Sequence, residues 1–212
     1  MKIKRRYLIN WLCLSGGISI IFYLLHDIVG AMNYDGYNWM SQAVSDLTAT
    51  DAPSFVIANG FVTVYKILSC LCCALVCILI KKESKKSLRL GIYLFSIMNY
   101  ISAIGYALFP LSSSGFDGST QSIIHVYALT SLVVLLSIIS LILIAIGSLR
   151  ENSKYRMLGI FAIISLVLMF VGAVGSANVP KEIFGVIERF STYSAVVFTG
   201  VLGLYGFKVF GD

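Results

Sequence analysis

Unbroken apolar stretches, each near or above the length that crosses a bilayer, limit most strongly how this chain can fold. A transmembrane helix needs about 20 apolar residues to cross ~30 Å of hydrocarbon. Six such stretches occur, at about 7–30, 54–80, 88–109, 120–148, 155–177 and 184–208. Their continuity favours helices, because the strands of a membrane barrel would alternate apolar and polar residues over ~10 positions. The sequence therefore predicts an all-α integral membrane protein, in which residues 1–212 form one domain, a bundle of six transmembrane helices.

The remaining composition fits the same class. The chain is 58% hydrophobic and 12% charged, whereas a soluble domain carries about a quarter charged residues. The opening MKIKRR resembles a secretory signal. However, the apolar run behind it is long for a signal and lacks an A-x-A site, so we expect a retained first helix. All five cysteines fall within the apolar stretches, which predicts no disulfide framework.

Basic residues are distributed unevenly among the connecting segments. Thirteen of the 16 lysines and arginines fall at the N-terminus, after the second and fourth stretches, or near the C-terminus. Because basic loops stay in the cytoplasm, both termini are predicted to be cytoplasmic, with the chain in the cell (cytoplasmic) membrane. The net charge of +6 is then a consequence of topology and of contact with anionic membrane lipids. Nucleic acid is not an expected partner, since the chain has no basic arm on a suitable fold.

The first connecting segment has the opposite charge pattern. Residues 26–47, HDIVGAMNYDGYNWMSQAVSDL, hold three acids and no lysine or arginine, so this loop is predicted to face outside. Apolar residues recur at helical spacing from Trp39 to Leu47, which predicts a short amphipathic helix at the outer interface. Ser41 and Ser45 are four residues apart on its other face, beside Asp46. They either line a binding site or form a solvated polar face.

Polar and charged side chains inside the stretches mark the candidate functional site, because an ionised group in hydrocarbon needs a partner or water. The set comprises His26 and Asp27 in the first stretch, Asn59 and Lys66 in the second, Gln121 and His125 in the fourth, and Glu188 and Arg189 in the sixth. Counted at ~1.5 Å per residue, they fall in the outer half of the membrane. Together with Asp46, they are predicted to converge on one polar pocket that opens toward the outer leaflet. Alternatively, these groups only hold the helices together.

Two contacts follow from the cost of burying charge. We expect Lys66 and Arg189 each to reach an acid of another helix, drawn from Asp27, Asp46 and Glu188. We expect the imidazole of His125 to contact one of those three acids, Ser41 or Ser45. If His125 is only a packing residue, it should instead meet a backbone carbonyl or a lone hydroxyl.

Motifs of known active sites do not occur in the sequence. It has no HExxH, P-loop or GxSxG pattern. Two histidines on different helices do not make a metal signature by their spacing. No metal site is predicted, and the cofactor is left open.

Several short motifs resemble a known family. They are Ser41-x3-Ser45-Asp46-Leu47, Asn59-Gly60, Phe109-Pro110, a lone His125 opening the fourth stretch, and Gly185-x2-Glu188-Arg189. In this order they are similar to the bacterial and archaeal membrane family catalogued as domain of unknown function 998, over almost the whole chain. The resemblance implies a multi-helix membrane protein and supports the polar set, but it implies no reaction. Members of that family often have an acid soon after Phe-Pro, whereas Asp117 here lies seven residues after Pro110.

Three classes of function remain after these observations. The first is binding or modification of a lipid or lipid-linked headgroup. In it, His125 acts as acid or base oriented by Asp46 or Glu188, while Arg189 or Lys66 holds an anionic group. The other pocket residues would contribute to substrate binding: His26, Asp27, Ser41, Ser45, Asn59 and Gln121. The second class is a transporter of lipid or small solutes, and the third is a structural or accessory subunit. The spans offer only Ser and Cys on the cytoplasmic side of Lys66, which favours the first class.

Overall fold

Six long apolar helices make up the protein in its computed structural model, which describes residues 7–81, 85–150 and 153–209. These residues are helical or irregular, and none of them forms a strand. The segments able to span a membrane are Leu8–Met32, Phe55–Ile80, Lys86–Leu108, Thr120–Leu149, Lys154–Gly175 and Lys181–Lys208. The all-α fold class is therefore confirmed, and the predicted boundaries differ by only a few residues.

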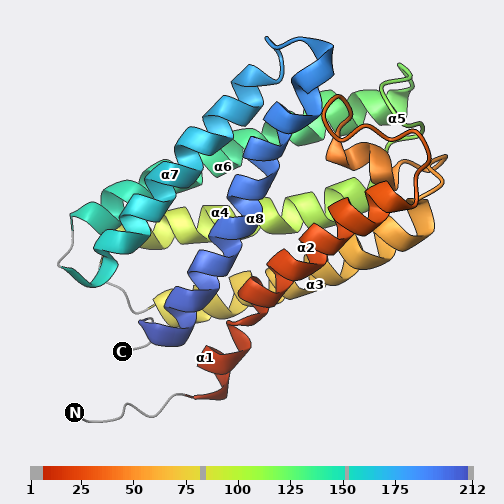
Figure 1. Ribbon diagram of the computed structural model, residues 1–212. Helices are drawn as coiled ribbons and strands as arrows, with labels where there is room; N and C mark the ends of the chain where they lie inside the picture. Colours follow the sequence, from red (N-terminus) through yellow and green to blue (C-terminus); the bar gives the residue numbers. More distant parts are fainter. Residues whose placement is uncertain (1–6, 82–84, 151–152, 210–212) are drawn as a thin grey trace.

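Some of the six segments are interrupted, as the ribbon in Figure 1 shows. The helices are α1 (Leu8–Leu12), α2 (Ser15–Met32), α3 (Phe55–Ile80), α4 (Lys86–Leu108), α5 (Thr120–Ile123), α6 (Thr130–Leu149), α7 (Ser153–Gly175) and α8 (Phe184–Lys208). A π-helix, Ile124–Leu129, joins α5 to α6. A short 3-10 turn, Lys181–Ile183, precedes α8. Each long helix is rich in apolar residues throughout, as burial in hydrocarbon requires.

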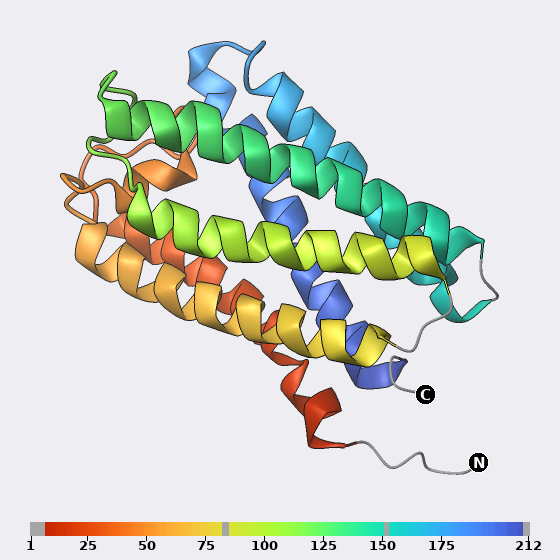
Figure 2. The same ribbon diagram turned by 180° about the vertical axis from the view of Figure 1, so that it is seen from behind.

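Successive long helices pack against each other in chain order, and α8 returns to α2 and α3 to complete the bundle. Each long helix begins at the end of the bundle where the preceding one finishes (Figure 1), so these neighbours are antiparallel, as expected for such bundles. The start of α1 and the end of α8 lie at the lower left of Figure 1, at the same end of the bundle as the end of α3 and the end of α6; we call this the terminal end. The connections 33–54, 109–119 and 176–183 form the opposite, loop end. Figure 2 shows the same arrangement from behind.

The described cations that the topology prediction counted lie at the terminal end, including Lys81, Lys86, Arg150 and Lys208. Five others, Lys2, Lys4, Arg5, Arg6 and Lys82, lie outside the described residues. The helices thus separate basic connections at one end from acidic loops at the other. Which end faces the cytoplasm stays a prediction.

The terminal half of the bundle is a packed apolar core. Cys72, Ile92 and Phe198 belong to this core and have no exposed surface. The rings of Phe95 and Phe198 meet edge to face at 5.1 Å between centroids. Small residues allow the close approach of backbones: a Cβ on Gly203 of α8 would meet the carbonyl oxygen of Cys13. The buried polar residues of this half include Asn10, Ser96 and Ser140, which are uncharged and donate to backbone carbonyls.

The predicted amphipathic helix from Trp39 to Leu47 is wrong in extent and type. Residues 39–41 form turns, and a 3-10 helix covers only Val44–Thr48. The reason is the fixed position of this loop: the N–H groups of Gly185 and Val186 donate to the carbonyl oxygen of Met40 at 2.8 and 3.2 Å. The backbone of this loop is therefore positioned by α8 rather than by an α-helical ladder of its own.

Candidate functional site

The predicted polar residues of the spans do gather in the loop-end half of the bundle. Counted at about 1.5 Å per residue, Asp27, His125 and Glu188 lie about 6–8 Å from the loop-end termini of their helices. Lys66 lies deeper, about 16 Å from the start of α3. The side chains divide into a closed network around Arg189 and a second group around His26, Lys66 and His125.

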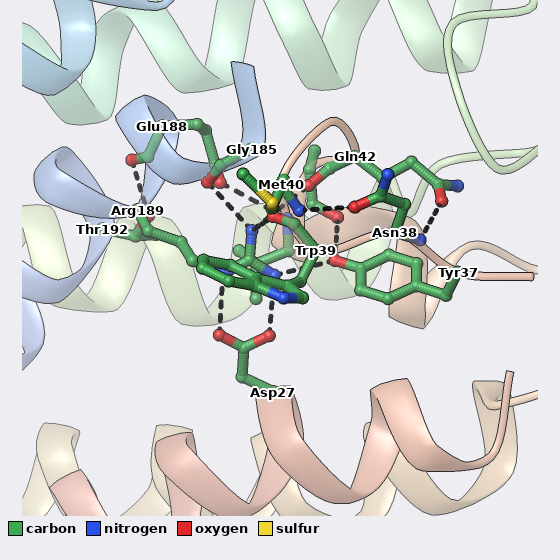
Figure 3. A network of polar contacts seen from close by, with 12 residues as sticks. Asp27, Tyr37, Asn38, Trp39, Met40, Gln42, Gly185, Glu188, Arg189 and Thr192 are labelled. Carbon is green, nitrogen blue, oxygen red and sulfur yellow. Dashed lines mark hydrogen bonds and ion pairs between the residues drawn. The ribbon is translucent and has the colours of Figure 1, made fainter. Parts of the chain in front are cut away.

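Arg189 is the centre of the closed network, shown in Figure 3. Its Nε and Nη2 donate to the two carboxylate oxygens of Asp27 at 2.9 and 2.8 Å, and Arg189 and Asp27 are each 8% exposed. Nη1 donates to the carbonyl oxygens of Trp39, Gln42 and Gly185, and Nη2 also donates to the Tyr37 hydroxyl. All the N–H groups of the guanidinium are thus engaged. The predicted pairing of Arg189 with an acid of another helix is confirmed.

Two tyrosines that were not predicted as site residues complete this network. The hydroxyl of Tyr193 donates to Asp27 at 2.8 Å, and the hydroxyl of Tyr37 donates to the carbonyl oxygen of Ala43 at 2.8 Å. Tyr193 lies four residues after Arg189, on the same face of α8, a spacing that could have revealed it. Tyr37 lies in an irregular loop, where no spacing rule applies. Burial raises the pKa of Tyr37, which keeps its hydroxyl protonated and able to donate.

Gly185 lets the first loop lie directly on α8. A Cβ at this position would meet the carbonyl oxygens of Gln42 and Trp39. The absence of a side chain brings those carbonyls within reach of Arg189, one helical turn further along α8. The Gly185-x2-Glu188-Arg189 motif is thus a docking surface for the loop.

Two aspartates join the first loop to the loop 109–119. Asp46 Oδ1 accepts the Gly115 N–H at 3.0 Å, and burial raises the pKa of Asp46 above its usual value. Asp51 accepts from the hydroxyl of Ser113 and the N–H of Ser114 at 2.9 and 2.8 Å. Hydrogen bonds, first that from Ser113, lower the pKa of Asp51. These hydrogen bonds join the two loops into one cover over the loop end.

Asp117 lies at the exposed edge of this cover. It accepts from the hydroxyl of Ser112 at 2.6 Å and from the N–H of Ser119 at 3.0 Å. These bonds, first that from Ser112, lower the pKa of Asp117 well below its usual value. Ser119 in turn caps α5 by accepting the Ser122 N–H at 3.2 Å. The side chain of Asp117 therefore orders a turn and a helix start.

Glu188 faces the first loop from α8. Its Oε2 accepts the Val44 N–H at 3.3 Å, and the side chain is half-buried. Glu188 acts electrostatically on Tyr23, Tyr106 and Tyr193, which come from three different helices. It therefore lies centrally in the loop-end half, close to both groups of polar side chains.

His26 has an environment unlike that of any other ionisable side chain in the site. It is 3% exposed, and neither Nδ1 nor Nε2 has a hydrogen-bond partner in the described structure. Its ring meets that of Tyr23 at 5.3 Å between centroids. Tyr23 in turn contacts Tyr65 and Tyr193 edge to face, at 4.9 and 5.4 Å. An aromatic wall from α2, α3 and α8 thus encloses a histidine with both nitrogens unpartnered.

Lys66 does not form the predicted ion pair. Among the described residues, no carboxylate oxygen lies within 4.0 Å of its ammonium nitrogen. The prediction failed because the acids it named have other partners: Arg189 engages Asp27, and backbone N–H groups engage Asp46 and Glu188. Lys66 is half-buried and lies close enough to His26 and His125 to act on both electrostatically.

His125 contacts neither an acid nor a serine of the loop, so this prediction is also wrong. Its Nδ1 lies 2.7 Å from the carbonyl oxygen of Phe109, and its ring meets Tyr106 at 4.7 Å between centroids. A carbonyl oxygen only accepts, so Nδ1 carries the proton of the neutral ring and Nε2 is left as an acceptor. These contacts match the packing alternative for Nδ1, with Nε2 still available to a ligand.

The π-helix around His125 was not foreseen from the sequence. It covers Ile124–Leu129, and the hydroxyl of Thr130 donates to the His125 carbonyl at 2.9 Å. The N–H of Thr130 donates to the same carbonyl, the i+5 bond of a π-turn. Single π-turns inside helices occur often at functional sites. A threonine five residues after the histidine is the only sequence hint.

The remaining predicted pocket residues lie at the edges of the site. Gln121 Nε2 donates to the carbonyl oxygen of Pro110 at 2.7 Å, which ties α5 to the end of α4. Ser41 makes a long hydrogen bond of 3.5 Å to the carbonyl of Asn38. Ser45 and Asn59 are half-buried, and their carbonyls accept from Thr48 and Thr63. The structure thus brings the charged members together and leaves these four at the rim.

An apolar groove of about 430 Å³ lies between α7 and α8, within the size range of small-ligand sites. Its apolar lining comprises Trp39, Phe161, Ile164, Leu168, Val186, Phe190, Val197 and Val201. Phe190 and Val197 are exposed, so the groove opens on the outside of the bundle. Arg189 and Tyr193 also line it. The groove therefore leads from the lipid-facing surface to the Arg189 network.

Metal binding has no obvious location in this arrangement. Across the part of the chain that the structure describes, no three His, Cys, Asp or Glu side chains are grouped to hold a metal ion. The donors instead come as separate pairs and single groups.

Comparison with known proteins places the chain in a family. The model of the family described as "Protein of unknown function (DUF998)" matches residues 18–205. The chain belongs to this family. No curated protein and no solved structure matches it. The resemblance expected from the short motifs is thus confirmed, and the matched range includes every predicted site residue.

Proposed function

We propose that this protein binds a membrane lipid, or a lipid-linked group, in the loop-end half of the bundle. The observation that carries the proposal is the shared lining at Arg189 and Tyr193, which belong both to the apolar groove and to the buried polar network. An alkyl chain suits the apolar lining between α7 and α8. The polar part of the ligand would lie at the loop end, where Trp39 suits a position at the headgroup level.

The packing of the other half favours binding over transport. A carrier needs polar groups that continue toward the second side of the membrane. Here the terminal half is filled by the apolar core around Cys72, Ile92 and Phe198. Binding is also favoured over catalysis, since His125 is positioned by a backbone carbonyl rather than by Asp46 or Glu188. Catalytic roles for these three residues stay predictions.

Filling the groove should remove the bound lipid. We expect Val197→Trp to lower lipid retention about tenfold, because a ligand would have to displace a packed indole, at a cost of about 1–3 kcal/mol. Lipids that remain after mild detergent extraction would be counted by native mass spectrometry. Val167→Trp is the matched control: Val167 is 55% exposed and Val197 44%, but Val167 does not line the groove. Equal retention in the two variants would remove the groove from the proposed function.

The proposed orientation places the loop end outside the cell and the terminal end in the cytoplasm. It is supported by the concentration of basic residues at the terminal end. With the native cysteines replaced, a thiol reagent that cannot cross membranes should label Asp35→Cys in intact cells and leave Lys85→Cys unlabelled. Labelling of both positions after the cells are opened shows that each cysteine is reactive. The reverse pattern in intact cells would invert the topology.

A further inference from the structure

We infer that His26 and Lys66 form an interior binding site for a phosphate group, either free phosphate or the phosphate of a lipid headgroup. The two residues lie on α2 and α3, which pack against each other, and neither lines the groove between α7 and α8. This inference goes beyond the proposed function and does not depend on it.

The unpartnered nitrogens of His26 are the first evidence. A neutral imidazole always carries one N–H donor and one acceptor, and a charged imidazole carries two donors. Buried polar groups in native proteins are nearly always hydrogen-bonded, so each exception needs an explanation. His26 is 3% exposed with no partner at either nitrogen. The ring is therefore arranged for a group that does not belong to the described chain.

The position of Lys66 is the second evidence. The Cα–Cβ bond of a helical residue tilts toward the helix N-terminus, which for α3 is the loop end. The ammonium of Lys66 is thus directed from mid-helix toward the level of His26 and His125, and it acts electrostatically on both. Within the described chain, this ammonium has no carboxylate ion-pair partner. An ammonium in a low-dielectric interior requires a compensating charge or water.

The balance of charge specifies the ligand. The buried charges Asp27 and Arg189 neutralise each other. Asp46 and Glu188 accept backbone N–H groups of the loops, so among the described residues Lys66 has no acid within ion-pair distance. A ligand with negative charge would meet the ammonium of Lys66 and an N–H of His26, as phosphate oxygens require. A cation would be repelled by Lys66, and a neutral alcohol would leave its charge uncompensated.

The test uses the full chain in dodecyl maltoside, with thermal unfolding followed by intrinsic fluorescence. Ligands that bind only the folded state raise the unfolding midpoint. The probes are inorganic phosphate, dodecyl phosphate and dodecanol. Stabilisation by both phosphates indicates a free anion, and stabilisation by dodecyl phosphate alone indicates a lipid headgroup. Either result supports the site. Equal stabilisation by dodecanol and dodecyl phosphate, or none by any phosphate, would overturn it.

Variants assign the effect to these two residues. Lys66→Met should fold, because it keeps a side chain of similar volume and removes a half-buried charge whose burial costs free energy. It should bind the effective phosphate about tenfold more weakly or worse, given the strength of charged hydrogen bonds. Lys181→Gln, which removes the same charge from an exposed position at the loop end, should bind like the wild type.

His26→Gln provides a second measurement that does not depend on Lys66. It keeps hydrogen-bonding capacity but changes its geometry, so a several-fold loss of phosphate binding is expected. Wild-type binding in both His26→Gln and Lys66→Met would show that only water occupies the site, and the inference would fail. The groove variant Val197→Trp should leave phosphate binding unchanged, so the two proposals can fail separately.

Discussion

Replacing Asp27 with alanine is expected to lower the free energy of unfolding by about 3–5 kcal/mol, the usual cost of leaving a buried charge unpaired. The Asp27 carboxylate accepts two hydrogen bonds from Arg189 and one from Tyr193. Without it, the guanidinium would remain buried and its Nε would lose its hydrogen-bond acceptor. Equilibrium unfolding in mixed micelles would measure the change.

Three further variants show whether the ion pair is the cause. Asp35→Ala removes an exposed acid of the first loop and should change the free energy of unfolding by no more than about 0.5 kcal/mol. Tyr193→Phe removes one hydrogen bond and should cost about 1 kcal/mol. Adding Arg189→Met to Asp27→Ala should recover part of the loss, because no unpaired charge would remain. A loss below about 1 kcal/mol for Asp27→Ala would mean that the pair is open to solvent.

The arrangement of helices could be predicted because hydrophobic length alone specifies it. Stretches that each exceed the bilayer thickness must be helical, and short connections make their neighbours antiparallel. The Asp27–Arg189 pair could also be predicted from the sequence, since opposite charges inside membrane spans are expected to pair. The depth of each residue along its helix and the sign of its charge were sufficient to predict that contact.

The partners of Lys66 and His125 could not be predicted in this way. Their partners depend on the rotation of each helix and on backbone atoms, which have no pattern in the sequence. Phe109 binds His125 through its carbonyl oxygen, a group that every residue has. Two of the acids predicted for Lys66, Asp46 and Glu188, accept backbone N–H groups instead. No sequence pattern marks backbone donors of this kind.

The prediction of an amphipathic helix in the first loop failed for the same reason. Its apolar residues recur at helical spacing, and in isolation this pattern favours an α-helix. In the protein, α8 binds the loop carbonyls of Trp39, Met40 and Gln42 through Arg189 and the N–H groups of Gly185 and Val186. Tertiary hydrogen bonds to the backbone therefore overrode the local preference.

Gly185→Ala is expected to undock this loop, with a loss of about 3 kcal/mol in the free energy of unfolding. The added methyl group would meet the carbonyl oxygens of Gln42 and Trp39, which are backbone atoms that cannot rotate away. Overpacking of this kind costs about 1–3 kcal/mol. Separation of the loop would also stretch the bonds from Arg189 to those carbonyls, each worth about 1.5–3 kcal/mol for a charged donor.

Chymotrypsin reports this undocking directly, because the loop contains Tyr34, Tyr37 and Trp39 but no lysine or arginine for trypsin. Cleavage between residues 34 and 40 should be faster in Gly185→Ala than in the wild type. Gly60→Ala is the matched control: no atom lies within 4 Å of its added Cβ. Alanine in that open helical position should stabilise the protein by about 0.5–1 kcal/mol and leave the loop protected. If Gly185→Ala behaves like Gly60→Ala, the loop does not rest on α8, and the network around Arg189 cannot be what holds the cover closed.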